Sequence, residues 1–169
     1  EYIPRMPGGV FEASNRPDFA YADTLHIITE IPSRLYTTVY IHNLNKYRYV
    51  RYKGPDGSHC NIAALLLYEN TTDTIPVSGD VIGPPGCWND DGTHEFTNVF
   101  DGDPYTSFDY KFPDGGWAGM DFKSPRKIGK LVYAPRNRDN FIRKGDLYEL
   151  LYWKDRQWNS AGRQLAQSD

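Results

Sequence analysis

Short runs of β-branched and aromatic residues, separated by Gly, Pro, Asn and Asp, recur along the whole chain. Residues 25–29 and 37–41 are two such runs, and each predicts a strand. Residues 47–52 alternate aromatic or apolar with basic side chains, apart from one offset, which predicts a half-buried strand. Residues 62–68 are apolar at both odd and even positions, so this run predicts a central strand covered on both faces.

The later part of the chain continues the pattern of short strands and turns. Further strands are predicted for residues 77–82, 117–122, 128–133 and 147–153. Residues 161–166 could form one turn of helix, and no longer helical period is present. Many short strands at regular spacing predict an all-β fold, either a β-sandwich or a jelly roll.

The composition indicates surfaces for ligand binding and argues against nucleic acid as a partner and against a membrane span. The 169 residues include 13 Tyr, 8 Phe and 4 Trp, which favour strands and offer flat faces to ligands. A formal net charge of −3 argues against nucleic acid, because phosphate binding needs a strongly basic surface. No apolar run approaches the roughly 20 residues of a membrane span.

Two cysteines, Cys60 and Cys87, leave two interpretations open. They form either a disulfide or a pair of buried thiols, since connectivity cannot be read from the sequence. The four histidines show no spacing typical of metal ligands. A zinc site, and catalysis by a metal, are therefore not expected.

Three ordered segments resemble the discoidin family, also called F5/8 type C or galactose-binding-like domains. Residues 98–108 are similar to its N-x-x-D-G-D/N-x-x-T-x-aromatic signature, and residues 117–122 to its W-h-x-h-D-L-G strand. Residues 131–158 resemble the Y-x-P-R…N…I…Y-E-h…W stretch of carbohydrate-binding members, in particular modules of secreted bacterial glycan-processing proteins. The resemblance implies a galactose-binding-like β-sandwich of the jelly-roll type in a secreted, periplasmic or cell-surface protein.

The first part of the chain resembles the later half of the same family. Residues 9–19 look like the strand and hairpin of residues 148–158, residues 47–52 like the family's yRYVRl strand, and residues 61–68 like its closing strand. With the polar connector 70–76 as boundary, residues 1–73 are the C-terminal half of one sandwich. Residues 74–169 are then the N-terminal part of a second sandwich. In the alternative arrangement, the two halves complete a single permuted sandwich.

The turn from residue 101 to residue 106 is a candidate metal site. Asp101, Asp103 and Thr106 place two carboxylates and a hydroxyl close together, which suits Ca²⁺. The alternative is a turn whose Asp side chains accept hydrogen bonds from their own backbone. The resemblance implies a structural Ca²⁺ held by these three residues. One departure counts against the metal: where the family's closing strand carries a Glu that completes the site, this chain has Ala64.

The loop of residues 136–140 is dense in hydrogen-bond donors and acceptors. Arg136, Asp139 and Asn140 would match the neighbouring hydroxyls of a sugar, and the resemblance implies that Arg136 and Asn140 bind ligand. Aromatic rings that the fold brings to the same end would cover the apolar face of the sugar: Trp88, Tyr105, Phe108 and Tyr110. The alternative is a solvated charged loop in which Arg136 pairs with Asp139.

No motif in the chain points to catalysis. A Gly-x-Ser-x-Gly elbow and a phosphate-binding loop are absent, and the spacing of carboxylates does not support a glycosidase pair. We therefore expect a non-catalytic carbohydrate-binding module that tethers a larger secreted or cell-surface protein to glycans, beside neighbouring domains of that protein. The alternative is a structural or protein-interaction spacer of a multidomain glycan-processing enzyme, which has kept the fold and lost the sugar site.

Overall fold

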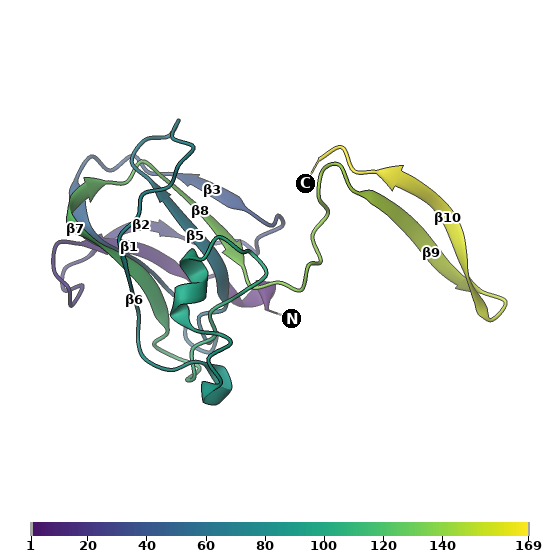
Figure 1. Cartoon of the computed structure of the whole chain (residues 1–169), viewed down its shortest axis with the longest axis horizontal. Coiled ribbons are helices and arrows are strands. Elements are labelled where there is room, and N and C mark those ends of the chain that lie inside the picture. Colours follow the sequence, from purple (N-terminus) through teal and green to yellow (C-terminus); the bar gives the residue numbers. More distant parts are fainter. Residues whose placement is uncertain (1, 169) are drawn as a thin grey trace. The chain divides into compact units, whose positions relative to one another are not determined.

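The computed structural model describes residues 2–168 and confirms the predicted all-β fold (Figure 1). The chain divides into two compact units, unit 1 (Glu1–Arg138) and unit 2 (Asp139–Asp169). Among the described residues, no helix is long and apolar enough to cross a membrane.

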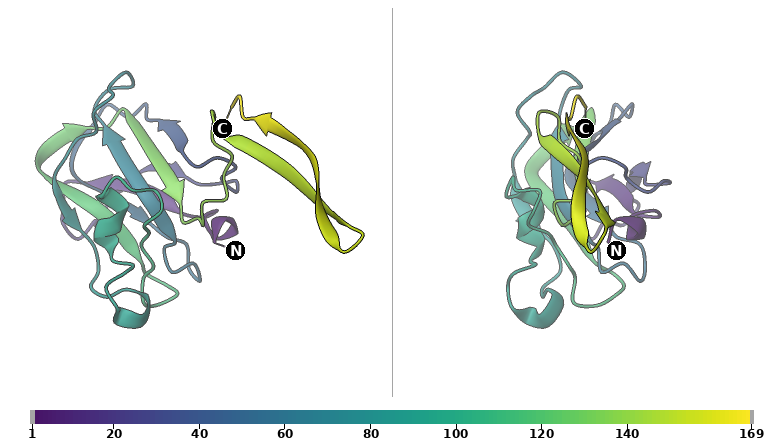
Figure 2. Two further views of the ribbon diagram at one scale, coloured as in Figure 1. Left: turned by 45° about the vertical axis from the view of Figure 1, so that its right-hand side comes forward. Right: turned by 90° about the vertical axis from the view of Figure 1, so that its right-hand side faces the viewer.

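Unit 1 is a sandwich of two antiparallel sheets (Figures 1 and 2). The larger sheet has the strand order β2-β1-β4-β7-β6, and the smaller has the order β3-β8-β5. The strands are β1 (Val10–Ser14), β2 (Asp23–Ile27), β3 (Thr37–Tyr40), β4 (Lys46–Lys53), β5 (Ile62–Tyr68), β6 (Asp80–Ile82), β7 (Trp117–Lys127) and β8 (Lys130–Pro135). Three short 3₁₀ turns accompany them: η1 (Ile3–Arg5), η2 (Trp88–Asp90) and η3 (Phe96–Phe100).

The core lies between the two sheets of unit 1. Phe11 on β1 and Tyr133 on β8 bridge the sheets, with ring centroids 5.1 Å apart. Both residues are buried, so their aromatic area is removed from water, which is the main favourable term in folding. The aromatic richness of the sequence is thus used first of all inside the sandwich.

The offset in the alternation of β4 has a structural cause. Val50 and Tyr52 point into the core, whereas Tyr49 packs on Phe19 and Arg51 lies over the same Phe19 ring. The pairing of β4 with β7 shifts its register between Tyr47 and Tyr49. An irregularity of this kind moves the side chains that follow it to the opposite faces.

Strand β5 is buried along almost its whole length, as its apolar pattern predicts. It lies at the edge of the smaller sheet, however, and not at the centre. Its second face is covered by other segments: η3 contacts the strand, and Ala63 and Ala64 pack with Ala134 and Leu35. Burial on both faces therefore did not require a central position.

Strands from both sides of residue 73 share these sheets. β4 pairs with β7, and β5 pairs with β8, both antiparallel. Residues 70–76 connect β5 to β6 within unit 1. Cys60 and Cys87, also in unit 1, are both buried free thiols.

Unit 2 contains one antiparallel hairpin, formed by β9 (Leu147–Lys154) and β10 (Gln157–Leu165). The helical turn considered for residues 161–166 is wrong, because residues up to Leu165 pair with β9 instead. Gly162, with a φ of 135°, has a low helix propensity. Cross-strand hydrogen bonds therefore decide the local structure here.

Candidate functional site

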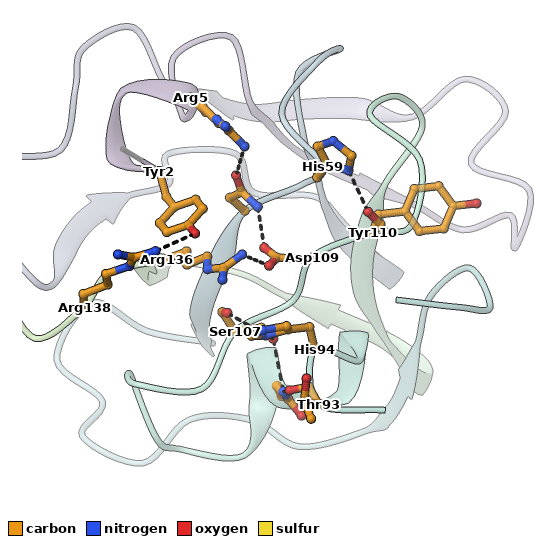
Figure 3. A network of polar contacts seen from close by, with 12 residues as sticks. Tyr2, Arg5, His59, Thr93, His94, Ser107, Asp109, Tyr110, Arg136 and Arg138 are labelled. Carbon is orange, nitrogen blue, oxygen red and sulfur yellow. Dashed lines mark hydrogen bonds and ion pairs between the residues drawn. The ribbon is translucent and has the colours of Figure 1, made fainter. Parts of the chain in front are cut away.

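A pocket of about 250 Å³ lies in unit 1, where the beginning of β5 and the end of β8 meet the loop before β7. Charged, polar and aromatic side chains line it: Tyr2, Arg5, His59, Asn61, Trp88, Asp109 and Arg136. We call this the Asp109 pocket. Figure 3 shows most of its side chains converging from segments far apart in the sequence.

Backbone hydrogen bonds place the three central residues side by side. The Phe108 N–H donates to the Ile62 carbonyl at 2.8 Å, which aligns Asp109 with Asn61. The Arg136 N–H donates to the Asn61 carbonyl at 3.4 Å. Extended backbone alternates its side chains, so the buried neighbours of Asn61 and Asp109 face the core while these two polar residues face the pocket.

A continuous chain of polar contacts forms the inner part of the pocket (Figure 3). The Asp109 carboxylate accepts a hydrogen bond from the Asn61 amide and forms an ion pair with Arg136. The side-chain oxygen of Asn61, Oδ1, accepts a hydrogen bond from Arg5 Nη1 at 3.1 Å. The Asp109 side chain is only 2% exposed and that of Arg136 18%. A carboxylate so deeply buried needs charge-bearing and hydrogen-bonding partners, and this chain supplies them.

Two aromatic rings line the pocket beside these polar groups. The Arg136 guanidinium lies 3.8 Å from the centre of the Tyr2 ring, and Arg138 donates a hydrogen bond to the Tyr2 hydroxyl at 3.1 Å. Stacking on a ring fixes a planar guanidinium and leaves its edge available for hydrogen bonds. Trp88 is 47% exposed and contacts the edge of His59, with centroids 5.0 Å apart.

The segments that carry His59 and Trp88 have an unusual backbone. His59 and Cys60 have φ values of 55° and 57°, and Asn89 and Asp90 have values of 62° and 49°. The left-handed region is costly for most residues other than glycine, although Asn, Asp and His adopt it more readily than others. His59 is held by two contacts with Tyr110: its carbonyl accepts the Tyr110 N–H at 2.7 Å, and its Nδ1 lies 2.9 Å from the Tyr110 carbonyl oxygen. Because a carbonyl oxygen only accepts, Nδ1 carries the proton.

The structure brings two of the residues predicted for sugar binding, Arg136 and Trp88, into the Asp109 pocket. Phe108 is fully buried in the core between Phe96 and Tyr110, because its bridge to Ile62 turns its ring inward. The ring therefore offers no face to a ligand.

The remaining residues predicted for sugar binding are divided between the two units. Tyr105 is 43% exposed and is not part of the pocket lining. Asp139 and Asn140 belong to unit 2, where Asp139 forms an ion pair with Arg143. Arg136 pairs with Asp109, and its side chain is mostly buried.

Five lining residues were not predicted from the sequence: Tyr2, Arg5, His59, Asn61 and Asp109. Asn61 and Asp109 could have been singled out in the sequence, because each is a polar residue directly beside an apolar residue that is buried, Ile62 or Phe108. A buried polar residue is more informative than an exposed one. No local pattern marks Tyr2 or Arg5, which reach the pocket only through the fold.

The loop predicted to hold calcium closes through its own hydrogen bonds. The Thr106 hydroxyl donates to Asp101 Oδ2 at 2.8 Å, and the Asp103 N–H donates to Asp101 Oδ1 at 2.7 Å. Asp103 Oδ1 in turn accepts the Tyr105 N–H at 2.8 Å. These bonds match the turn that the sequence left open as the alternative. Among residues 2–168, no group of three or more His, Cys, Asp or Glu side chains is placed to hold a metal, and the Ca²⁺ site stays a prediction.

Comparisons with protein-family models, with curated proteins and with solved structures found no match for this chain. The resemblance to discoidin domains therefore rests on the quoted motifs and stays a prediction. The structural feature from which a function can be argued is the Asp109 pocket, which combines buried donors and acceptors with aromatic rings.

Proposed function

We propose that this chain is a non-catalytic carbohydrate-binding module with a galactose-binding-like jelly roll, and that it binds sugar in the Asp109 pocket. The observation that carries the proposal is the Arg5–Asn61–Asp109–Arg136 chain of contacts beside the rings of Tyr2 and Trp88. Each sugar hydroxyl both donates and accepts hydrogen bonds. A lining that alternates guanidinium donors with amide and carboxylate acceptors is therefore complementary to several hydroxyls at once.

The size of the pocket indicates how much of a glycan it would take. Pockets for drug-sized ligands are usually about 300–1,000 Å³, and the Asp109 pocket, at about 250 Å³, is smaller. It therefore suits one sugar ring or the end of a glycan. The exposed Trp88 ring would cover the apolar face of that sugar.

The charged groups of the pocket favour binding over hydrolysis. A glycosidase commonly uses two carboxylic groups on either side of the scissile bond. Among the residues described as lining the pocket, Asp109 is the one carboxylate, and it is already paired with Arg136. In this proposal the module tethers a larger secreted, periplasmic or cell-surface protein to glycans. Ca²⁺ at Asp101, Asp103 and Thr106 would stiffen a neighbouring loop.

A glycan array followed by titration calorimetry with the intact chain tests the proposal. Trp88→Ala should weaken binding about tenfold. A stacked aromatic contact contributes about 0.5–1.5 kcal/mol beyond the effect of the area that it buries, and a loss of about 1.4 kcal/mol in binding free energy is a tenfold loss of affinity. The matched control is Tyr40→Ala, which removes an exposed ring on β3 that does not line the pocket. A folded chain that binds no glycan would instead support the spacer function.

A further inference from the structure

The hairpin of unit 2 repeats the hairpin with which unit 1 begins. Two backbone hydrogen bonds close the open end of each hairpin. In unit 1, Gly8 N–H donates to the Ile28 carbonyl at 2.8 Å, and Ile28 N–H donates to the Gly9 carbonyl at 2.9 Å. In unit 2, Gly145 N–H donates to the Ala166 carbonyl and Ala166 N–H to the Asp146 carbonyl, both at 2.9 Å. The glycines that start the two hairpins share the left-handed conformation, with φ values of 92° and 96°. The two hairpins therefore have equivalent positions.

The strand register extends this equivalence into the hairpins. Val10 pairs with Ile27 and Phe11 with His26 in unit 1, and Leu147 pairs with Leu165 and Tyr148 with Gln164 in unit 2. A register shift follows in both hairpins, directly after the Phe11–His26 pair in unit 1 and two pairs later, after Leu150–Gly162, in unit 2. The equivalence therefore places Tyr148 at the position of Phe11, Glu149 at that of Glu12, and Leu150 at that of Ala13.

In unit 1, the strand that covers these positions is β4. It pairs with the edge of β1 that β2 leaves open, with Tyr52 opposite Phe11 and Arg51 opposite Glu12. The Phe11 and Tyr52 rings lie 5.0 Å apart, and both are fully buried. Arg51 Nε donates to Glu12 Oε1 at 2.6 Å on the other face of the sheet. An aromatic pair on one face and an ion pair on the other thus fix this strand.

Among the described residues, unit 2 has no counterpart of β4. β9 and β10 form a two-stranded sheet, and all eight residues of β9 are exposed. A hollow of about 310 Å³ lies at the base of the hairpin. Three of its lining residues, Tyr148, Gln164 and Ala166, occupy positions whose equivalents in unit 1 are Phe11, His26 and Ile28. Phe11 and Ile28 are fully buried there.

We infer that the free edge of β9 binds an antiparallel strand that alternates aromatic and basic side chains, as β4 does, contributed by another sandwich of this type. An aromatic ring of that strand would enter the hollow beside Tyr148, and an arginine would lie opposite Glu149. The Glu149 carboxylate is already paired with Arg163 of β10 at 3.2 Å, so it would be shared between the two arginines. A hairpin of two strands is only marginally stable alone, and an uncovered apolar edge promotes pairing with a further strand. A second copy of this chain does not supply the strand, because β4 already lies between β1 and β7.

A synthetic peptide of residues 45–54, which contains the β4 sequence, tests the inference on the intact chain. We expect it to bind, with NMR shift changes concentrated in residues 147–154. A control peptide with Arg51→Glu should bind about tenfold more weakly, because like charges opposite each other on paired strands are unfavourable. The charge-reversed chain Glu149→Arg should reverse this preference and bind the control peptide better.

Several results would overturn the inference. One is a peptide that does not bind, and another is a peptide whose shift changes fall on unit 1. Loss of binding in Glu149→Arg without any gain for the control peptide would show that the opposed charges do not matter. Self-association of the chain in sedimentation experiments, abolished by Leu150→Lys on β9, would identify a second copy as the partner. None of these measurements depends on sugar binding.

Discussion

The buried Asp109 carboxylate is ion-paired with Arg136, and the Arg136 guanidinium is in turn stacked on the ring of Tyr2 at 3.8 Å. One arginine therefore both neutralises a charge inside the sandwich and lines the pocket. Its role in stability can be separated from its proposed role in binding by choosing substitutions that leave Asp109 with or without a partner.

Arg136→Ala should destabilise unit 1 by about 2–4 kcal/mol, because it leaves the 2% exposed Asp109 carboxylate without its ion pair. Urea denaturation followed by tryptophan fluorescence measures the loss. Asp109→Asn in the same chain should restore part of it, since the remaining amide carries no charge. The matched control is Arg16→Ala, whose partner Asp18 is exposed, and which should leave the denaturation midpoint almost unchanged. Equal effects of the two arginine substitutions would contradict the structural role of Arg136.

Asp121→Asn should lower stability at pH 7 by an amount that shrinks in acid. The hydrogen bonds from Arg48, at 2.8 Å and 3.0 Å, hold the pKa of Asp121 well below its ordinary value. A carboxyl group whose pKa is depressed by folding stabilises the protein above its unfolded pKa of about 3.9. This stabilisation is lost as the pH falls through the folded pKa. Melting temperatures of the wild-type and variant chains should therefore converge below about pH 4. A difference in melting temperature that stays constant across that pH range would show that the charge of Asp121 does not contribute to stability.

If the loop at Asp101 holds Ca²⁺, a chelator should lower the melting temperature of the chain and added Ca²⁺ should restore it, because a ligand of the folded state stabilises that state. Asp101→Asn should remove both responses. Calorimetric scans in each buffer measure them. No response of the wild-type chain to either reagent would favour the metal-free turn, in which Thr106 and the Asp103 N–H satisfy the Asp101 carboxylate.

Both cysteines should be inert to Ellman's reagent in the folded chain and should titrate as two thiols in denaturant. Cys60 and Cys87 are buried free thiols, and burial raises the pKa of Cys60 far above its ordinary value. A high pKa keeps the thiol protonated, and the reactive form is the thiolate. Detection of no thiol after unfolding without reductant would reveal a disulfide instead.

The sequence predicted the strands of unit 1 well because alternation and apolar runs report how each segment is buried. Burial does not specify which segment does the covering. Strand β5 is therefore an edge strand covered by η3, although its pattern suggested a central one. In the same way, the aromatic character of Phe108 could not reveal that its bridge to Ile62 turns the ring into the core.

The candidate site was only partly predictable for a related reason. Arg136 and Trp88 stand in polar loops with visible chemistry, and both line the pocket. Asp109 forms part of a site only together with Asn61 and Arg136. The pairing of β5 with β8 brings these two residues together, and the bridge between Ile62 and Phe108 places Asp109 beside them. Spacing along the chain does not encode such a pairing, so the site could not be assembled before the fold was known.

The polar contacts of the Asp109 pocket join residues that are distant in the sequence: Arg5 and Asn61 are 56 residues apart, and Asn61 and Asp109 are 48 apart. Contacts of such long sequence separation are slow to form, because the entropy of closing large loops must be lost first. A partly folded chain could keep its local hairpins and still lack every one of these contacts. Occupancy of the pocket by a ligand would consequently count only those molecules in which these distant segments have come together, which makes ligand binding an assay of the folded smaller sheet with its surrounding loops.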